Sequence, residues 1–367
     1  MKKLVAIVVA LMASLAMVAS AQAADETVVG TTKLESKSGP FYKAKAVPAE
    51  LEIHAEVTTP PSSPLVNPLK NTKLTFPKGM SFYPDNKKTP PCTDAMLSVQ
   101  SNLADPPGVV KACSKSVVGT GISTIILAKI NNNPNTLIDD PILIIFNAGK
   151  DNKGQPKIKI YGYSKTTNVG ILMYGTLVGR TLDVAVPVLS NDSAVKFYTF
   201  YMPGPRLDRD DINIDVRGLD PNYVRASCPD GIWRTNSEFI LGERTYPGGQ
   251  PTSPDVLVKS PETTQECTGL AGKAKLAVKV KGPKAVKAGR KGAFKVTVTN
   301  NGTGIAKGVK VNATGGGKGK VGNLNPGAKK TITVRTKVTG RKGSKKKLTF
   351  TAKGGATGKA SVKVTVR

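Results

Sequence analysis

The only histidine of the chain lies between two glutamates, in a segment where polar and apolar residues alternate. Glu52, His54 and Glu56 are spaced two residues apart, and residues two apart on a strand point to the same side of a sheet. Two carboxylates and an imidazole on one face are possible metal ligands. We favour the simpler interpretation of a solvated polar face. No nucleophile-elbow motif supports His54 as a general base, so we assign no catalytic residue, no metal ligand and no cofactor.

A second acidic segment has the opening spacing of a calcium-binding loop, because residues 211–215 read Asp-x-Asn-x-Asp. The rest of the loop does not fit. Val216 stands where such a loop requires glycine, and Asn222 stands where it requires a bidentate glutamate. The alternating apolar residues of 212–216 instead predict a strand with its polar side chains outward.

Aromatic side chains before residue 270 suit either a sugar-binding platform or a buried core, and we favour the core. They are Trp233, Tyr161, Tyr163, Tyr174, Tyr198 and Tyr201. Acidic residues are too scattered for the sequence to select a catalytic pair of the glycosidase type.

The amino terminus has the features of an export signal. Two lysines precede an apolar run from Leu4 to Val18, and Ala21-Gln22-Ala23 matches a small-x-small cleavage site. We expect residues 1–23 to be removed, and we expect no transmembrane segment in the mature chain, since no later run is long and apolar enough. The sequence thus predicts a secreted protein.

Four cysteines are expected to form two disulfides in an oxidising compartment. Zinc is the weaker alternative, because no pair has the short spacing of a structural zinc site. Of the three possible pairings we favour nearest neighbours, Cys92 with Cys113 and Cys228 with Cys267.

The positive charge is concentrated at one end of the chain. The protein carries 54 Lys+Arg and 25 Asp+Glu, a net charge of +29. Residues 271–367 contain 26 Lys and Arg and no acidic residue, whereas residues 24–270 are nearly neutral. This change in composition predicts two units, a first one over 24–270 and a basic one over 271–367.

The basic unit has the period-two alternation of half-buried strands. Six strands follow from its inward-facing sets, which are 276/278/280, 294/296/298, 309/311/313, 332/334/338, 348/350/352 and 362/364/366. Turn sequences such as Asn300-Asn301-Gly302 and Asn325-Pro326-Gly327 separate them. The pattern predicts a small immunoglobulin-like β-sandwich.

Several stretches of this unit resemble the CARDB-type bacterial immunoglobulin-like domains. They are 288–302, 306–311 and Leu324-Asn325-Pro326-Gly327, within a match over about 273–367. The resemblance implies an extracellular sandwich used as a spacer or in adhesion, and it assigns no functional residue.

The first unit is also predicted to be all-β, as one large disulfide-linked sandwich or jelly-roll-like domain. Candidate strands cover 51–58, 117–130, 141–146, 157–163, 170–178, 181–189, 195–201, 212–216 and 232–241. Residues 24–48 suit an arm or an extra strand. With its motifs Val118-Gly119-Thr120-Gly121 and Cys228-Pro229-Asp230-Gly231, the unit resembles secreted actinobacterial proteins of unknown activity.

The density of lysines suggests an acidic partner, since neighbouring cations repel one another across a Debye length of about 8 Å. An anionic wall polymer or polysaccharide would relieve that repulsion and release counterions. The candidate contact residues are Lys275, Lys279, Lys281, Lys295, Arg335, Lys337, Lys345, Lys346, Lys347 and Lys363. Sequence-specific nucleic acid binding is disfavoured, because no aromatic residues are interleaved with the lysines to stack on bases. The alternative is that the lysines only confer solubility.

Three hypotheses about function follow. The leading one is a secreted, non-enzymatic protein held non-covalently on the cell envelope by its basic unit. The second is a carbohydrate-binding or adhesion protein in which the basic unit is a spacer. The third is a hydrolase that uses acidic residues of the first unit.

Overall fold

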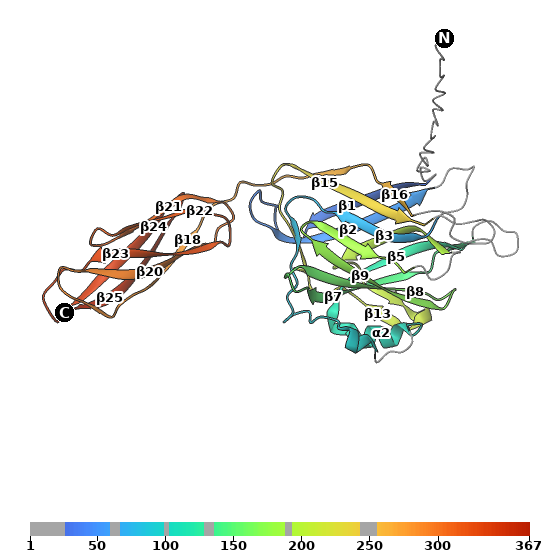
Figure 1. Cartoon of the computed structure of the whole chain (residues 1–367), viewed down its shortest axis with the longest axis horizontal. Helices are drawn as coiled ribbons and strands as arrows, with labels where there is room; N and C mark the ends of the chain where they lie inside the picture. Colours follow the sequence, from blue (N-terminus) through green and yellow to red (C-terminus); the bar gives the residue numbers. More distant parts are fainter. Residues whose placement is uncertain (1–25, 59–66, 99–102, 128–135, 188–192, 243–254) are drawn as a thin grey trace, which may run out of the picture.

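The computed structural model describes residues 26–58, 67–98, 103–127, 136–187, 193–242 and 255–367. The expected signal peptide, residues 1–23, lies outside them. Strands make up 59% of the described residues and helices 6%, which confirms the all-β prediction. In Figure 1 the strands form two bodies, one built from residues before 270 and one from residues after it.

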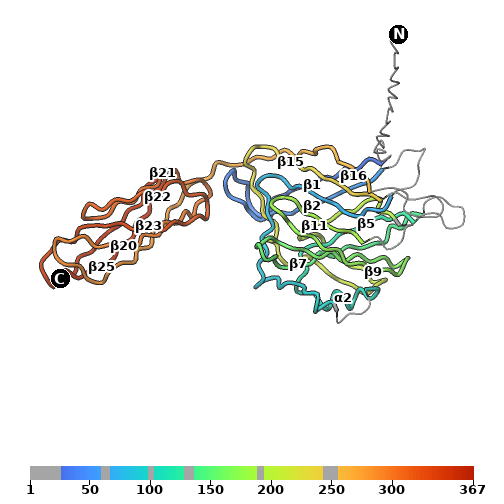
Figure 2. Tube along the Cα trace, viewed as in Figure 1, coloured from blue at the N-terminus to red at the C-terminus, as the bar shows by residue number. Residues whose placement is uncertain are grey.

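The first body is built on one 15-stranded sheet. Its main strand order is β16-β15-β3-β10-β9-β8-β7-β5-β11-β2-β14-β4. In addition, β1 pairs with β2, β17 pairs with β15, and β6 pairs with β5. These strands are β1 (Thr27–Ser36), β2 (Val47–Thr58), β3 (Leu69–Thr75), β4 (Met80–Phe82), β5 (Val117–Leu127), β6 (Thr136–Ile138), β7 (Ile142–Lys150), β8 (Pro156–Ser164), β9 (Val169–Val178), β10 (Thr181–Ala185), β11 (Ser193–Met202), β14 (Val224–Ala226), β15 (Ile232–Leu241), β16 (Val256–Lys259) and β17 (Thr263–Glu266). Figure 2 shows the chain in the same view as a Cα trace.

The sheet curls until β1 lies against the segment that contains β15, β16 and β17, and side chains join the two. Gln265 accepts from the Leu34 amide at 2.8 Å and donates to the Leu34 carbonyl at 3.0 Å. The Gly30 amide donates to Ser260 Oγ at 2.9 Å. A Cβ at Gly30 would lie 2.1 Å from Ser237 Oγ, so glycine permits this close approach. The larger hydrophobic cluster of the body lines the concave side of the curled sheet.

Two short helices cover part of the convex side. They are α1 (Asp94–Ser98) and α2 (Pro106–Cys113), followed by the 3₁₀ turn η1 (Ser114–Ser116). Beside them lie β12 (Leu207–Arg209), the 3₁₀ turn η2 (Asp210–Ile212) and β13 (Ile214–Val216). The outward residues of β7 and β8, including Ile144 and Tyr161, pack beneath these elements in a second cluster. Both faces of β7 and β8 are therefore buried.

Both predicted disulfides are present. Cys92–Cys113 joins the start of the helical segment to its end, and Cys228–Cys267 joins the segment after β14 to the end of β17. The second bridge lies near the point where the chain leaves the first body. Close by, the Leu270 amide donates to the Phe41 carbonyl, and the Lys43 amide donates to the Leu270 carbonyl, both at 2.9 Å.

The second body is a sandwich of two sheets. A three-stranded sheet has the order β18-β20-β23, and a five-stranded sheet has the order β19-β25-β24-β21-β22. The strands are β18 (Leu276–Lys281), β19 (Ala285–Val286), β20 (Lys291–Asn300), β21 (Ala306–Ala313), β22 (Lys318–Leu324), β23 (Lys329–Lys337), β24 (Lys345–Lys353) and β25 (Thr357–Val366). Its core cluster lies between the sheets and shares no residue with those of the first body. Phe294 and Phe350 meet there from opposite sheets, with ring centroids 5.3 Å apart.

One buried polar residue fixes the turn after β20. Asn300 donates to the carbonyls of Gly304 and Leu324, at 2.8 and 3.0 Å, and its Oδ1 accepts from the Lys275 and Gly302 amides, at 3.1 and 3.0 Å. Each polar atom of this amide thus has partners, as a buried amide requires. The sequence Asn300-Asn301-Gly302 is a turn for this structural reason.

Several predicted strands need correction. The strand predicted over 117–130 is β5 as far as Leu127, and residues 128–130 lie outside the described part. The strand predicted over 181–189 ends at Ala185, and residues 188–189 lie outside the described part. Ile212 belongs to η2 rather than to a strand. Residues 27–36 form strand β1, which settles the arm-or-strand alternative. In the second body two strands were not predicted. Strand β19 is only two residues long. Along β22 the alternation is interrupted at Gly322, which has φ +91°.

A buried lysine gives the first body a defined response to acid. Lys159 Nζ donates to the Cys92 carbonyl at 2.7 Å and lies 2.8 Å from Asp94 Oδ1. The hydrogen bond from Lys159 is the main reason that the pKa of Asp94 lies below its ordinary value, and partial burial opposes it. The ionised Asp94 therefore stabilises the fold above about pH 4, the unfolded-state pKa, and this contribution is lost as the pH falls through the lowered folded-state pKa.

We expect Lys159→Met to lower the free energy of unfolding by about 2 kcal/mol at pH 7, because hydrogen bonds from a charged donor are lost. The deficit should be smaller at about pH 3 than at pH 7, because the stabilisation by ionised Asp94 begins to be lost below its unfolded-state pKa of about 4. Urea unfolding at the two pH values measures this difference. Lys150→Met, at an exposed position, is the matched control. An equal deficit at both pH values would show that the ion pair does not contribute.

Candidate functional site

The histidine segment forms part of β2, which pairs with β1, β11 and β14. Glu52, His54 and Glu56 alternate with buried residues, as predicted. His54 Nδ1 lies 2.8 Å from Thr199 Oγ1 on the neighbouring strand β11, and its ring packs near Phe197. In the part of the chain that the structure describes, no group of three or more His, Cys, Asp or Glu side chains is placed to hold a metal ion. The geometry thus favours the polar-face interpretation of His54.

In the segment that resembles the start of a calcium-binding loop, the carboxylates are paired with arginines. Arg209 makes two hydrogen bonds to Asp211, at 2.7 and 2.9 Å, and Arg206 makes two to Asp215. The hydrogen bonds from Arg209 are the largest cause that lowers the pKa of Asp211 to about 2. Asn213 ends η2 in the left-handed conformation. Each carboxylate is thus neutralised by a guanidinium.

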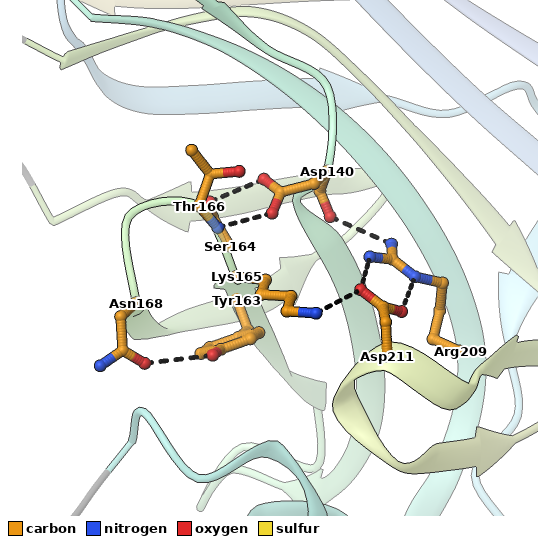
Figure 3. A network of polar contacts seen from close by, with 8 residues as sticks. All are labelled: Asp140, Tyr163, Ser164, Lys165, Thr166, Asn168, Arg209 and Asp211. Carbon is orange, nitrogen blue, oxygen red and sulfur yellow. Dashed lines mark hydrogen bonds and ion pairs between the residues drawn. The ribbon is translucent and has the colours of Figure 1, made fainter.

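Figure 3 shows that Asp211 belongs to a wider polar network. Asp140 accepts from Ser164 Oγ and from the Thr166 amide, both at 2.7 Å, and its carbonyl accepts from Arg209 at 3.3 Å. Lys165 Nζ lies 3.6 Å from Asp211. The network joins the turn between β8 and β9 to the start of β7 and to η2.

Most of the aromatic residues are core residues, as the sequence analysis favoured. Trp233, Tyr161, Tyr163 and Tyr198 are buried, whereas Tyr201 is partly exposed. Tyr174 is 45% exposed, but its hydroxyl donates to Asp94 at 3.0 Å. These positions provide no exposed aromatic platform for a sugar within the described residues.

The cations of the second body all lie at its surface. Each of the 26 Lys and Arg residues after residue 270 is exposed, and the alternating apolar residues between them are buried or half-buried. The expected separation of aliphatic and basic side chains is therefore present. The basic residues do not share one side, however, because the two sheets of the sandwich have separate outer faces.

The outer face of the five-stranded sheet holds a regular set of lysines, which we call the lysine face. Its members are Lys310, Lys318, Lys320, Lys345, Lys347, Lys353, Lys359 and Lys363. Lys353 on β24 is paired in register with Lys310 on β21, and Lys310 is paired with Lys320 on β22. Lys347 and Lys363 are likewise paired across β24 and β25. Three adjacent strands therefore carry a row of three lysines.

The outer face of the three-stranded sheet is also basic but less regular; we call it the opposite face. Its members are Lys279, Lys281, Lys291, Lys295, Lys329, Arg335 and Lys337. Here Lys281 pairs with Lys295, but Lys295 pairs with Thr333 on the next strand. Its in-register cations occur in pairs rather than in rows of three.

Like charges directly opposite each other destabilise a sheet, and neighbouring strands are only about 4.8 Å apart. No acidic residue of the second body offsets the lysine face, since residues 271–367 contain none. In the first body, by contrast, Lys33 and Lys37 each lie 2.8 Å from a carboxylate oxygen. The lysine face is thus a surface whose own repulsion a bound polyanion would relieve.

The ten predicted contact residues fall into three groups. Lys345, Lys347 and Lys363 belong to the lysine face, and a further five lie on the opposite face: Lys279, Lys281, Lys295, Arg335 and Lys337. The other two residues lie on neither face. Lys275 precedes β18. Lys346 is on the same side of β24 as the core residues Leu348 and Phe350, but it lies at the exposed start of the strand. The row Lys310, Lys320 and Lys353 was not among the predicted contact residues. Lys310 and Lys353 adjoin predicted strand residues, but Lys320 lies on β22, which was not predicted and which sets the register of the row.

Comparison of the sequence with models of known protein families and with curated proteins finds no match. Within the described residues, no helix combines the length and the apolar character needed to cross a membrane.

Proposed function

We propose that this protein is a secreted, non-enzymatic component of the cell envelope, and that its basic sandwich binds an anionic wall polymer. The sandwich would hold the first body at the polymer without a covalent link. The CARDB-like resemblance of residues 273–367 agrees with an extracellular attachment role.

The observation that carries the proposal is the row formed by Lys310, Lys320 and Lys353 within the lysine face. Three ammonium groups on adjacent strands match a chain of closely spaced anionic groups better than they match one small anion. Binding would replace lysine–lysine repulsion by attraction and would release condensed counterions.

A polymer with phosphate or carboxylate groups fits this surface better than a specific nucleic acid sequence does. Serine, threonine and asparagine separate the lysines, as at Thr349, Thr351, Ser361 and Asn312. These side chains donate hydrogen bonds to anionic oxygens, but they offer no ring on which a base can stack.

We expect the purified protein to bind poly(glycerol phosphate) with an affinity that falls steeply with salt. If six to eight lysines contact phosphates, the slope of log K against log salt is about −4 to −6. Isothermal titration at several salt concentrations measures this slope, with neutral dextran as the control polymer. Absence of binding at about 50 mM salt, or unchanged affinity at about 1 M salt, would contradict the electrostatic mechanism. A polyuronate run in parallel separates phosphate from carboxylate preference.

A further inference from the structure

The first body contains an apolar cavity of about 340 Å³ on the concave side of its curled sheet. Seven strands contribute to its wall: β3, β5, β7, β8, β9, β10 and β11. Aliphatic side chains such as Leu143, Ile160, Ile171, Met173 and Val184 make up most of the lining. The cavity reaches the surface near Leu127, Val169 and Pro187, which are half-buried or exposed.

The hydroxyls of Thr72, Ser123, Ser164 and Tyr198 in the wall already have partners within the protein. Thr72 Oγ1 lies 3.1 Å from the Tyr198 hydroxyl, and Ser123 Oγ donates to the Phe197 carbonyl at 2.8 Å. Ser164 Oγ donates to Asp140. Burial raises the pKa of Tyr198 to about 12, so its hydroxyl is neutral at physiological pH. A ligand in this cavity therefore meets hydrocarbon and satisfied dipoles.

The size of the cavity distinguishes it from a packing defect. Protein cores contain few voids larger than a water molecule, whereas ligand pockets start at about 300 Å³. At about 30 Å³ per molecule, this volume corresponds to about eleven waters. Those next to the wall would meet mainly hydrocarbon, so their replacement by an apolar ligand is favourable.

The rim of the cavity is preorganised. Pro141, Ser164 and Thr167 line it, and they adjoin the residues of the network in Figure 3. Asp140 holds Ser164 and the Thr166 amide, and Arg209 links Asp140 to Asp211. Tyr163 donates to Asn168 across the same turn at 3.1 Å. These bonds fix the turn between β8 and β9 at the edge of the opening.

We propose that this cavity binds one aliphatic chain, such as an acyl or isoprenoid chain of about eleven carbons, since a methylene group occupies about the volume of a water molecule. The lining is mainly branched aliphatic, and two of its three rings, Tyr198 and Phe200, pack on each other with centroids 5.0 Å apart. A flexible chain fits such a wall better than a flat aromatic ligand does. The polar head would remain at the rim, outside the cavity.

The test is displacement of the fluorescent apolar probe N-phenyl-1-naphthylamine from the purified protein. We expect one probe per protein and displacement by straight-chain alcohols and carboxylates alike. Affinity should rise about fourfold per methylene and should level off beyond about eleven carbons. No displacement, equal displacement by short and long chains, or stronger displacement by naphthalene-type competitors than by aliphatic chains would overturn the proposal.

Ile171→Trp, which fills the cavity, should weaken chain binding more than tenfold. Val178→Trp lies on the same strand β9 at a position that is 55% exposed, and it should bind like the wild type. Val186→Trp, at the half-buried outer part of the wall, is the second blocking variant if Ile171→Trp does not fold. Unchanged binding in a folded blocking variant would place the ligand elsewhere and contradict the proposal. Because the cavity and the lysine face lie in different bodies, either proposal can fail without the other.

Discussion

Replacing Lys310, Lys320 and Lys353 with glutamine should weaken binding to poly(glycerol phosphate) about 100-fold at low salt. The three side chains form the row on adjacent strands, so the variant removes the most closely spaced cations of the lysine face. The slope of log K against log salt should become about 2 less negative, because about 0.7 counterions are released per contact. Titration at several salt concentrations gives both numbers.

The same variant should melt at a higher temperature than the wild type. Removing like charges from directly opposed positions gains about 0.2–1 kcal/mol per pair, and about 1 kcal/mol raises the melting temperature of a domain of this size by about 4–8 °C. Weaker binding in a more stable protein cannot be explained by unfolding. The matched control carries Lys281, Lys295 and Lys337 replaced with glutamine on the opposite face. If that control loses as much affinity as the row variant, the assignment to the lysine face is wrong.

Removal of the Cys228–Cys267 bridge should destabilise the first body by about 4 kcal/mol. The bridge closes a loop with a sequence separation of 39 residues, and the loss of loop-closure entropy in the unfolded chain predicts this magnitude. Scanning calorimetry of the double Cys→Ser variant measures it. We expect two transitions in the wild type, because the two bodies have separate cores, and only the transition of the first body should shift.

The other bridge is the comparison for this experiment. Cys92–Cys113 has a sequence separation of 21 residues, so its removal should cost about 3 kcal/mol, slightly less than the longer loop. A shift of the second transition after removal of Cys228–Cys267 would show that the sandwich depends on the first body. No shift of either transition would contradict the entropic estimate.

The sandwich could be predicted from its sequence because its signal is local. Phe294, Val296 and Val298 alternate with polar residues and are fully buried, and the same holds for Leu348, Phe350 and Ala352. The nearest-neighbour disulfides were also predictable, since each closes a short segment of the first body. In that body β15 was predicted with the bounds Ile232–Leu241 that it has.

What the sequence did not reveal depends on register and on long-range closure. Alternation placed Lys310 and Lys353 outward, but only the pairing of β21 with β24 brings them together. The sequence did not decide whether the first residues form an arm or a strand. The burial of β1 depends on β2 on one side and on Gln265 and Ser260 on the other, and the last two are distant in the sequence. The cavity could not be predicted, because it results from the curvature of seven strands. The residue pattern of a single strand does not show whether the space beside it is filled.

The exit of the chain from the first body is firmly held, which suits an attachment role for the sandwich. Leu270 exchanges backbone hydrogen bonds with Phe41 and Lys43, and the Cys228 amide donates to the Tyr42 carbonyl at 3.1 Å. Cys228 is bonded to Cys267. A force applied to the sandwich would therefore act on the Cys228–Cys267 disulfide and on the segment around Tyr42.

Lysine footprinting locates the bound polymer on the surface of the sandwich. The protein is acetylated at low salt with and without poly(glycerol phosphate), and the modification of each lysine is measured by mass spectrometry. We expect the polymer to protect Lys310, Lys320 and Lys353, together with Lys347 and Lys363, and to leave Lys281, Lys295 and Lys337 reactive. Protection spread evenly over both faces, or confined to the opposite face, would contradict binding at the lysine face.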